Sequence, residues 1–397
     1  MKCDQHVIEK KPILEDPSRR EFLSDMAKTS AAFSLPLMLG AVGASCTSVG
    51  YSIAERSDRR LVKMGTPEGR TPMAPVASDI RSPLAIITDQ QSVQEDGRIH
   101  PAVVHSMIRK GIRALGGTSK VEDGWAKVFP AYKKGEKIGI LINPSQELRT
   151  QAEVVAGLVQ ELINLGIAPA DIIVWGNVLF IGMSWKKMGF DPLVKDFGVT
   201  LRTSHDKEAG FDTEHQAELP SADLRLPFSR ILTSQCDYVI SVPVLKSHSL
   251  CGVTGALKLS YGTIPIADAL LPGRGSGAPS RRHLMDAVKK VHANNGDPQI
   301  AELAANPVIR QKTCLYLGDA LLSRYDGGPF GPPQWINRQI LVSQDPVALD
   351  YQAFQIVEKK RLEKNLQSII LWCKFIQTAA EMGLGTNHPD QIAYMSI

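Results

Sequence analysis

Two lysines and a histidine stand close together in residues 243–258 (PVLKSHSLCGVTGALK). Lys246 and His248 are two positions apart, so in an extended strand both side chains would share one face. An ammonium group beside an imidazole lowers the pKa of both, which favours either an anionic ligand or a neutral histidine that acts as a base. Lys258 ends the same stretch. A solvated strand end with an incidental histidine is the other interpretation, and chemistry alone does not separate the two.

Other polar residues follow apolar runs, at the positions where parallel strands would end. Asn143, Asn177, Asp319 and Asp345 each stand at or just after such a run. Ligands of open parallel sheets bind outside the carboxyl ends of the strands. Any one of these residues is more commonly a cap or turn residue than a site residue. Their shared position makes them candidates.

Two loops complete the candidate site. Residues 272–283 combine flexible glycines, three arginines and a serine that opens a helix; this loop suits an anionic group, and a plain surface loop explains it as well. Residues 327–333 (GGPFGPP) form either a wall of the site below Asp319 or a structural crossover turn. The candidate catalytic residues are therefore Lys246, His248 and Lys258. The candidate substrate-binding residues are Asn143, Thr254, Gly255, Arg274, Asp319 and Asp345.

Alternating strand and helix patterns must position these residues. Near-continuous apolar runs, typical of strands covered on both faces, occur at 83–88, 137–143, 171–177, 237–243, 313–319 and 339–343. Helical spacing predicts helices at 102–115, 152–165, 282–292, 346–360 and 368–382, the last with a stripe of Ile369, Ile370, Cys373, Ile376 and Ala380. Strand–helix–strand units of this length imply parallel pairing. We expect an α/β fold with an open, mostly parallel sheet and helices on both faces.

The composition is that of a globular protein, with 397 residues of which 43% are hydrophobic and 22% are charged. A net charge of +4 is too weak to indicate nucleic-acid binding, and no arginine-rich tract with interleaved aromatic residues occurs. A serine hydrolase is disfavoured because no Gly-x-Ser-x-Gly elbow occurs. A dinucleotide oxidoreductase is disfavoured because no Gly-x-Gly-x-x-Gly follows the first strand.

The N-terminal segment has the pattern of an export signal. Arg19 and Arg20, in the hexapeptide SRREFL, precede an apolar stretch at about 31–42 that is too short to span the ~30 Å core of a bilayer. This pattern predicts a twin-arginine signal peptide at 1–45, with the twin-arginine translocase as export partner and a periplasmic or other extracytoplasmic location. An amphipathic helix that contains two arginines by chance is the alternative.

Small residues before Cys46 mark a cleavage site, and lipidation of Cys46 would anchor the protein. Gly43 stands where lipoprotein signals usually carry leucine, which argues against anchoring. Residues 46–82, rich in Ser, Arg, Gly and Pro, indicate a linker or surface arm, and residues 83–397 a single α/β domain. No other segment approaches the ~20 uninterrupted apolar residues of a transmembrane helix.

The cysteines of the predicted domain are widely spaced, at Cys236, Cys251, Cys314 and Cys373. No Cys-x-x-Cys pair occurs, which argues against an iron–sulfur cluster or a structural zinc site. Scattered buried thiols are the simpler interpretation, although an extracytoplasmic location permits disulfides. A metal held by His248, Asp319 and a further carboxylate is a third alternative, and the sequence identifies no cofactor.

Four motifs, in order, resemble the family called domain of unknown function 362. They are residues 237–248 (DYVISVPVLKSH) with 254–258 (TGALK) and Gly262, residues 318–320 with the loop 327–331, residues 345–350 (DPVALD), and residues 384–390 (LGTNHPD). The resemblance implies an α/β fold, and the sequence shows no equivalent of the ferredoxin-like module of some members. Two residues depart from the family pattern. Leu141 stands where the family often has lysine, and Leu259 stands where it usually has asparagine. The resemblance assigns no activity.

Two function classes follow. In the first, the protein is an exported enzyme in which Lys246 and His248 form an acid–base pair, Lys258 and the arginine loop orient an anionic substrate, and Asp319 or Asp345 orients the imidazole. In the second, a non-catalytic binding or cofactor-maturation factor uses the same cationic pocket to hold a small anion, a cofactor or a partner segment. The sequence separates neither class from the other and gives no oligomeric state. In both, exposed strand-end residues should contribute little to folding.

Overall fold

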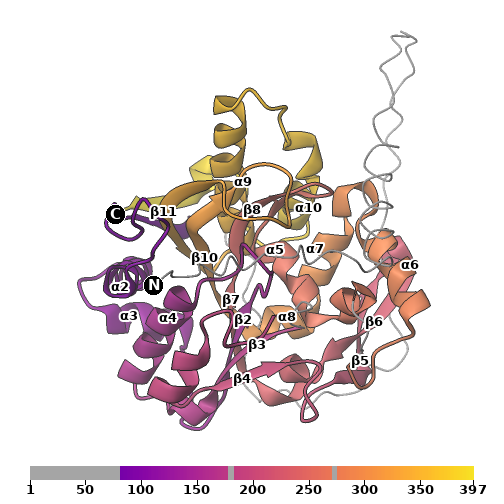
Figure 1. Ribbon diagram of the computed structural model, residues 1–397, viewed down its shortest axis with the longest axis horizontal. Helices are drawn as coiled ribbons and strands as arrows, with labels where there is room; N and C mark the ends of the chain where they lie inside the picture. Colours follow the sequence, from indigo (N-terminus) through magenta and orange to yellow (C-terminus); the bar gives the residue numbers. More distant parts are fainter. Residues whose placement is uncertain (1–80, 178–182, 271–274) are drawn as a thin grey trace, which may run out of the picture. The chain divides into compact units, whose positions relative to one another are not determined.

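The strand patterns build one ten-stranded sheet in the part of the chain that the structure, a computed structural model, describes: residues 81–177, 183–270 and 275–397 (Figure 1). Its main path runs β12-β1-β11-β10-β7-β2-β3-β4, with β8 and β9 attached beside β10. All neighbours from β10 to β4 are parallel, whereas β11 is antiparallel to both of its neighbours. The strands of this sheet are β1 (Ser82–Thr88), β2 (Ile138–Ile142), β3 (Ile172–Gly176), β4 (Thr200–Thr203), β7 (Tyr238–Val242), β8 (Val244–His248), β9 (Gly252–Thr254), β10 (Thr313–Arg324), β11 (Trp335–Ser343) and β12 (Ile392–Ser396).

The central strands are buried on both faces, which explains their near-continuous apolar sequences. In β2, β3 and β7 every residue is buried. Successive side chains of a strand point to opposite faces, and alternate residues accordingly enter two separate cores: Ile138 and Ile140 pack into one, Leu141 into the other. The predicted α/β fold, with a mostly parallel sheet and helices on both faces, is confirmed.

Different parts of the chain cover the two faces. The first face is covered by α2 (Pro101–Gly116), α3 (Val121–Val128) and α4 (Ala152–Asn164), which lie together in indigo and magenta in Figure 1. The second face is covered by a two-stranded sheet and later helices: β5 (Phe211–Leu219), β6 (Leu224–Ser229), α5 (Ala256–Leu259), α6 (Arg281–Val291), α7 (Gln299–Ala304), α8 (Pro307–Lys312), α9 (Pro346–Glu363) and α10 (Lys374–Glu381). The second core therefore encloses the stretch that carries the predicted chemistry.

β8 continues the chain directly beyond β7, and this connection places the stretch 243–258 inside the fold. After Pro243, β8 pairs in parallel with β10, where Lys246 lies opposite Arg324. Its other edge pairs antiparallel with β9, where Lys246 lies opposite Thr254 and His248 opposite Gly252. The apolar patterns predicted β7, but they predicted neither β8 nor β9.

The C-terminal helix expected at 368–382 is wrong in its first third. Ile370–Trp372 form a separate 3₁₀ turn, and α10 begins only at Lys374. A 3₁₀ turn has three residues per turn instead of 3.6, so the expected stripe does not continue through it. Ile369 and Cys373 are buried as expected, but Ile370 is 59% exposed.

The predicted signal peptide at 1–45 and nearly all of the predicted linker at 46–82 lie outside the described residues. Ser82, placed in the linker by the sequence, instead begins β1, and its hydroxyl donates to Asp345 Oδ2 at 2.6 Å. Within the described ranges, no helix combines the length and apolarity needed to cross a membrane.

Candidate functional site

The β8–β9 hairpin holds two of the predicted residues in the interior. Lys246 is fully buried and His248 is 4% exposed. The expectation that both are exposed at a strand end is wrong, because β10 pairs with one edge of β8 and β9 with the other. The loop after β10 also covers the hairpin: Gly328 N donates to Ser247 Oγ at 3.2 Å, and Ser249 N donates to the Gly328 carbonyl at 3.0 Å.

Lys246 is held by the loop that follows β2. Its Nζ donates to Ser145 Oγ at 2.8 Å and to the Leu148 carbonyl at 2.9 Å. The Ser145 hydroxyl in turn donates to Asn143 Oδ1 at 2.8 Å, so Asn143 acts on Lys246 through Ser145. Burial, with Lys258 and Arg324 nearby, lowers the pKa of Lys246 to about 7.

His248 is neutral, and its hydrogen bond defines which ring nitrogen carries the proton. The Leu250 amide donates to His248 Nδ1 at 3.1 Å, so Nδ1 is the acceptor and Nε2 carries the hydrogen. The ring stacks on His292 with a centroid distance of 5.6 Å and an interplanar angle of 11°. Burial, and then the positive charge of Lys258, lowers the pKa of His248 well below its ordinary value.

His292 joins the two histidines to Lys258. Its Nδ1 lies 2.8 Å from the Val288 carbonyl, which can only accept, so Nδ1 carries the hydrogen and Nε2 is an acceptor. Lys258 Nζ lies 3.4 Å from that Nε2 and 4.8 Å from the centroid of the Tyr261 ring. Burial lowers the pKa of Lys258 and, with Lys258 nearby, lowers that of His292 to about 3. Sequence reasoning missed His292, because no local spacing relates it to Lys258, 34 positions earlier.

These four residues, Lys246, His248, Lys258 and His292, form what we call the basic cluster. The charged groups that shift their pKa values are Lys246, Lys258, Arg324, His292 and the Cys251 thiol, with no carboxylate among them. Within the described ranges, no Asp or Glu side chain hydrogen-bonds to a member of the cluster. Buried cations in proteins are normally paired. Three predicted residues, Lys246, His248 and Lys258, thus lie in one buried region where no carboxylate of the described residues is bonded to them.

The predicted carboxylates serve backbone amides instead of the imidazole. Asp319 accepts from Gln151 N at 2.8 Å and Leu321 N at 3.3 Å, and burial raises its pKa to about 7. Asp345 caps α9 by accepting from the amides of Val347 and Ala348. The hypothesis that Asp319 or Asp345 orients His248 is therefore wrong. The Leu250 amide and the His292 ring orient it.

Thr254 and Gly255 support the hairpin and the start of α5. The Thr254 hydroxyl donates to the Lys246 carbonyl at 2.9 Å, across the β8–β9 pair. A Cβ added at Gly255 would lie 2.0 Å from Asp350 Oδ1, so this position has no room for a side chain. Asp350, which sequence reasoning did not select, accepts from Ala256 N and Leu257 N, the first amides of α5.

The two predicted loops have different outcomes. Arg274 lies outside the described residues. The loop 327–333 packs around Arg324, which approaches Lys246 across the β8–β10 pair: Arg324 Nη1 donates to the Pro332 carbonyl at 2.8 Å, and a Cβ at Gly331 would lie 2.5 Å from the same nitrogen. The loop therefore covers β8 and holds Arg324.

A metal site and disulfides are two further possibilities that the sequence raises. Across the described ranges, no group of three or more His, Cys, Asp or Glu side chains is arranged to hold a metal ion. Cys236, Cys251, Cys314 and Cys373 are free thiols, three of them buried.

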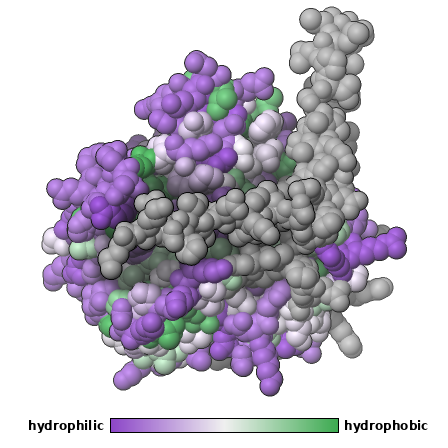
Figure 2. Space-filling view, viewed as in Figure 1, coloured by the Kyte–Doolittle hydropathy of each residue, from purple (hydrophilic) through white to green (hydrophobic). Residues whose placement is uncertain are grey.

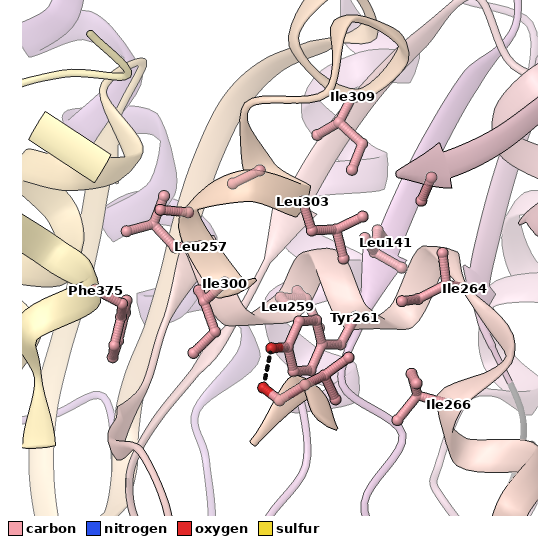
Figure 3. Packing of buried hydrophobic residues seen from close by; sticks show 14 of the residues in the cluster. Leu141, Leu257, Leu259, Tyr261, Ile264, Ile266, Ile300, Leu303, Ile309 and Phe375 are labelled. Atoms are coloured by element: carbon pink, nitrogen blue, oxygen red, sulfur yellow. Dashed lines mark hydrogen bonds between the residues drawn. The ribbon is translucent and has the colours of Figure 1, made fainter. Parts of the chain in front are cut away.

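The two leucines that depart from the family pattern lie near each other in the second core. A Cβ at Gly262 would lie 3.4 Å from Leu141 Cδ1 and 4.0 Å from Leu259 Cδ1. Figure 3 shows Leu259 beside Tyr261 and Leu141 beside Leu303. The Tyr261 hydroxyl donates to the Val291 carbonyl at 2.6 Å. Both leucine positions are therefore apolar and buried in the second core.

Residues 137–355 match the family model described as Domain of unknown function (DUF362). None of the curated proteins matches the chain. Among solved structures, the chain is similar to a structural-genomics target from Thermotoga maritima, with 13% identity, a TM-score of 0.35 and coverage of 70% of this chain. It spans 59% of that protein's chain. Because the family model covers more than half of the sequence, the chain belongs to the family of domain of unknown function 362.

Proposed function

We propose that the basic cluster binds a small anionic ligand. The observation that carries this proposal is the burial of Lys246, His248 and Lys258 beside the half-buried His292, with no carboxylate of the described residues bonded to any of them. An unpaired buried cation destabilises a fold by several kcal/mol, about the penalty of losing its partner. A bound anion would remove that penalty, and this gives the site its affinity.

The cluster also retains hydrogen-bond donors that no described residue uses. Lys246 has three ammonium hydrogens and donates two of them, to Ser145 and Leu148. The Nε2 hydrogen of His248 has no hydrogen-bond acceptor among the described residues. Lys258 donates only to His292 among those residues. Unused donors without competing acceptors suit a phosphate, sulfate or carboxylate group.

Lys246 is the residue that we propose for proton transfer if the protein is an enzyme. Its pKa of about 7 would let it exchange a proton at neutral pH. His248 would donate a hydrogen bond from Nε2 and hold developing negative charge, because its Nδ1 already accepts the Leu250 amide. The two residues then have different roles: Lys246 transfers the proton, and His248 donates a hydrogen bond.

A non-catalytic binding or cofactor-maturation factor is the second candidate function. Both acceptor nitrogens of the stacked histidines are already occupied, His248 Nδ1 by Leu250 and His292 Nε2 by Lys258. Neither histidine is therefore free to accept a proton from a substrate. This favours a protein that holds its ligand without transforming it, and native mass spectrometry of protein purified from its own host would show whether an anion or organic cofactor is retained.

Calorimetric titration with inorganic phosphate, sulfate and acetate tests the binding proposal. We expect at least one of these anions to bind the wild-type protein. Lys246→Met and Lys258→Met should each lower the affinity for that anion by about tenfold or more, because each removes one charged hydrogen bond. Lys120→Met, which removes an exposed lysine at the start of α3, is the matched control. Equal affinity in all four proteins, or no binding of any anion to wild type, would overturn the proposal.

Export by the twin-arginine route belongs to the same proposal and rests on Arg19, Arg20 and the short apolar stretch that follows. The test replaces both arginines by lysine, which keeps the charge. We expect the variant to stay unprocessed in the cytoplasm while wild type is exported. Normal processing of the double variant would refute the assignment.

A further inference from the structure

The 3₁₀ turn between α9 and α10 presents apolar side chains to solvent. Three consecutive large residues, Ile370, Leu371 and Trp372, are 59%, 68% and 36% exposed. Leu362, near the end of α9, is 54% exposed. Single exposed leucines are ordinary on protein surfaces, but a run of three adjacent apolar residues is not. These four residues are called the apolar tip below.

The apolar tip is held by its neighbours. Ile369 and Cys373, on either side of the turn, are 1% and 6% exposed and anchor it in the second core. Ile369 N donates to Glu358 Oε2 at 3.0 Å, and Arg361 Nε donates to the Gln367 carbonyl at 3.1 Å, so α9 fastens the loop before the turn. These contacts hold the apolar tip in one defined conformation although its side chains are exposed to water.

The sequence on either side of the apolar tip is rich in basic residues. Residues 356–375 contain five basic residues and two acidic ones, a net of +3 in a chain whose total is +4. Lys359, Lys364 and Lys374 are exposed and form no ion pair with a described residue, whereas Glu363 pairs with Lys360. Figure 2 shows hydrophobic surface beside hydrophilic surface at the top of the view, over this C-terminal segment.

We infer that the apolar tip is a docking surface for an anionic lipid bilayer. Apolar side chains with a tryptophan at the level of the headgroups, flanked by lysines, are the arrangement by which peripheral proteins bind membrane surfaces. Each lysine near an anionic surface strengthens binding, and salt weakens it. A second copy of the chain is a poorer occupant, because a two-fold contact would set the same lysines against each other.

Co-sedimentation of the full chain with vesicles tests the inference. We expect the protein to bind vesicles that mix phosphatidylcholine with phosphatidylglycerol. Its affinity for vesicles of phosphatidylcholine alone should be lower by at least about tenfold. The variants Ile370→Ser/Leu371→Ser and Lys364→Glu/Lys374→Glu should each lower binding to the mixed vesicles by about tenfold. Val194→Ser removes a 46% exposed apolar residue on another element and should bind like wild type.

Tryptophan fluorescence distinguishes membrane contact by the apolar tip from contact by residues 1–80, because residues 1–80 contain no tryptophan. Brominated lipids quench tryptophan fluorescence only at bilayer depth, so the quenching lost in Trp372→Phe reports the position of Trp372. We expect that difference to account for most of the quenching. Equal quenching in wild type and Trp372→Phe would overturn the inference, as would a concentration-dependent dimer that Ile370→Ser/Leu371→Ser abolishes without any change in vesicle binding.

Discussion

The basic cluster and the buried carboxylates are two sets of ionisable groups at similar depth in one fold, and they differ in what their atoms bind. Asp345 accepts from Ser82, Val347, Ala348 and Thr386. Every bond of this carboxylate goes to a group of the protein itself. The basic cluster, in contrast, keeps unused donors and has no carboxylate partner among the described residues.

This difference separates structural burial from functional burial. Asp350 likewise accepts the first two amides of α5, so its charge is distributed over donors that helix α5 must satisfy in any case. Lys246 donates to Ser145 and Leu148 and Lys258 contacts His292, but neither lysine has a carboxylate partner among the described residues. Perturbed groups of this kind mark functional sites more often than random positions do. Removing a carboxylate should therefore affect folding, and removing a lysine should affect binding.

The largest effect should follow from Asp345→Ala. The change leaves two amides of α9 and the Thr386 amide without their acceptor, and we expect the free energy of unfolding to fall by more than about 3 kcal/mol. Urea denaturation measures this loss. Phosphate affinity of the folded fraction should remain that of wild type. A stable variant that binds phosphate weakly would break the comparison and return Asp345 to the binding site.

Gly255→Ala should come next. The added Cβ would displace Asp350 from the amides of α5, at an expected cost of about 2 kcal/mol from overpacking. Gly262→Ala is the matched control, because its Cβ would make only ordinary contacts with Leu141 and Leu259. Thermal unfolding of the two variants should differ by several degrees. Equal melting temperatures would show that Asp350 moves freely and does not support α5.

Lys246 and Asp319 should contribute opposite slopes to the dependence of the free energy of unfolding on pH. The folded pKa of Lys246, about 7, lies below its unfolded value of about 10.5, so between these values the unfolded chain binds the extra proton and stability rises with pH. The folded pKa of Asp319, also about 7, lies above its unfolded value, so its contribution falls as pH rises from about 4 to 7.

Urea denaturation of wild type and two variants, without added anion, measures these slopes. Lys246→Met should remove up to about 1.4 kcal/mol per pH unit of slope above pH 7, and Asp319→Asn should remove a slope of opposite sign below pH 7. Parallel curves for wild type and Lys246→Met would show that Lys246 keeps its proton throughout, and the proton-transfer role would then be lost.

Tyr261→Phe should have the smallest effect on stability. It tests whether a residue that contacts Lys258 supports the fold or the bound anion. It removes the hydrogen bond to the Val291 carbonyl at a cost of about 1 kcal/mol, and it keeps the ring beneath Lys258. We expect a small decrease in melting temperature with unchanged phosphate affinity. A tenfold loss of affinity would place the Tyr261 hydroxyl among the ligand's contacts.

Local patterns in the sequence predicted much of the sheet. β2, β3 and β7 were predicted within a residue of their ends, because a strand buried on both faces must be apolar throughout. The strands that the patterns missed are β4, β5, β6, β8, β9 and β12, which are very short, alternate or carry charge. The 3₁₀ turn at Ile370–Trp372 was missed because a helical stripe and a 3₁₀ turn have similar apolar spacing over one turn.

The sequence by itself determined that Lys246 and His248 share one face of a strand, since residues two apart in an extended chain always do. Only the tertiary structure decided that this face is buried, that His292, the residue after α6, stacks on His248, and that the nearby carboxylates accept from backbone amides. These contacts join residues up to 168 positions apart. Hydrophobic periodicity acts over a few residues, whereas burial and counter-ion distance depend on how whole elements pack, which no local pattern encodes.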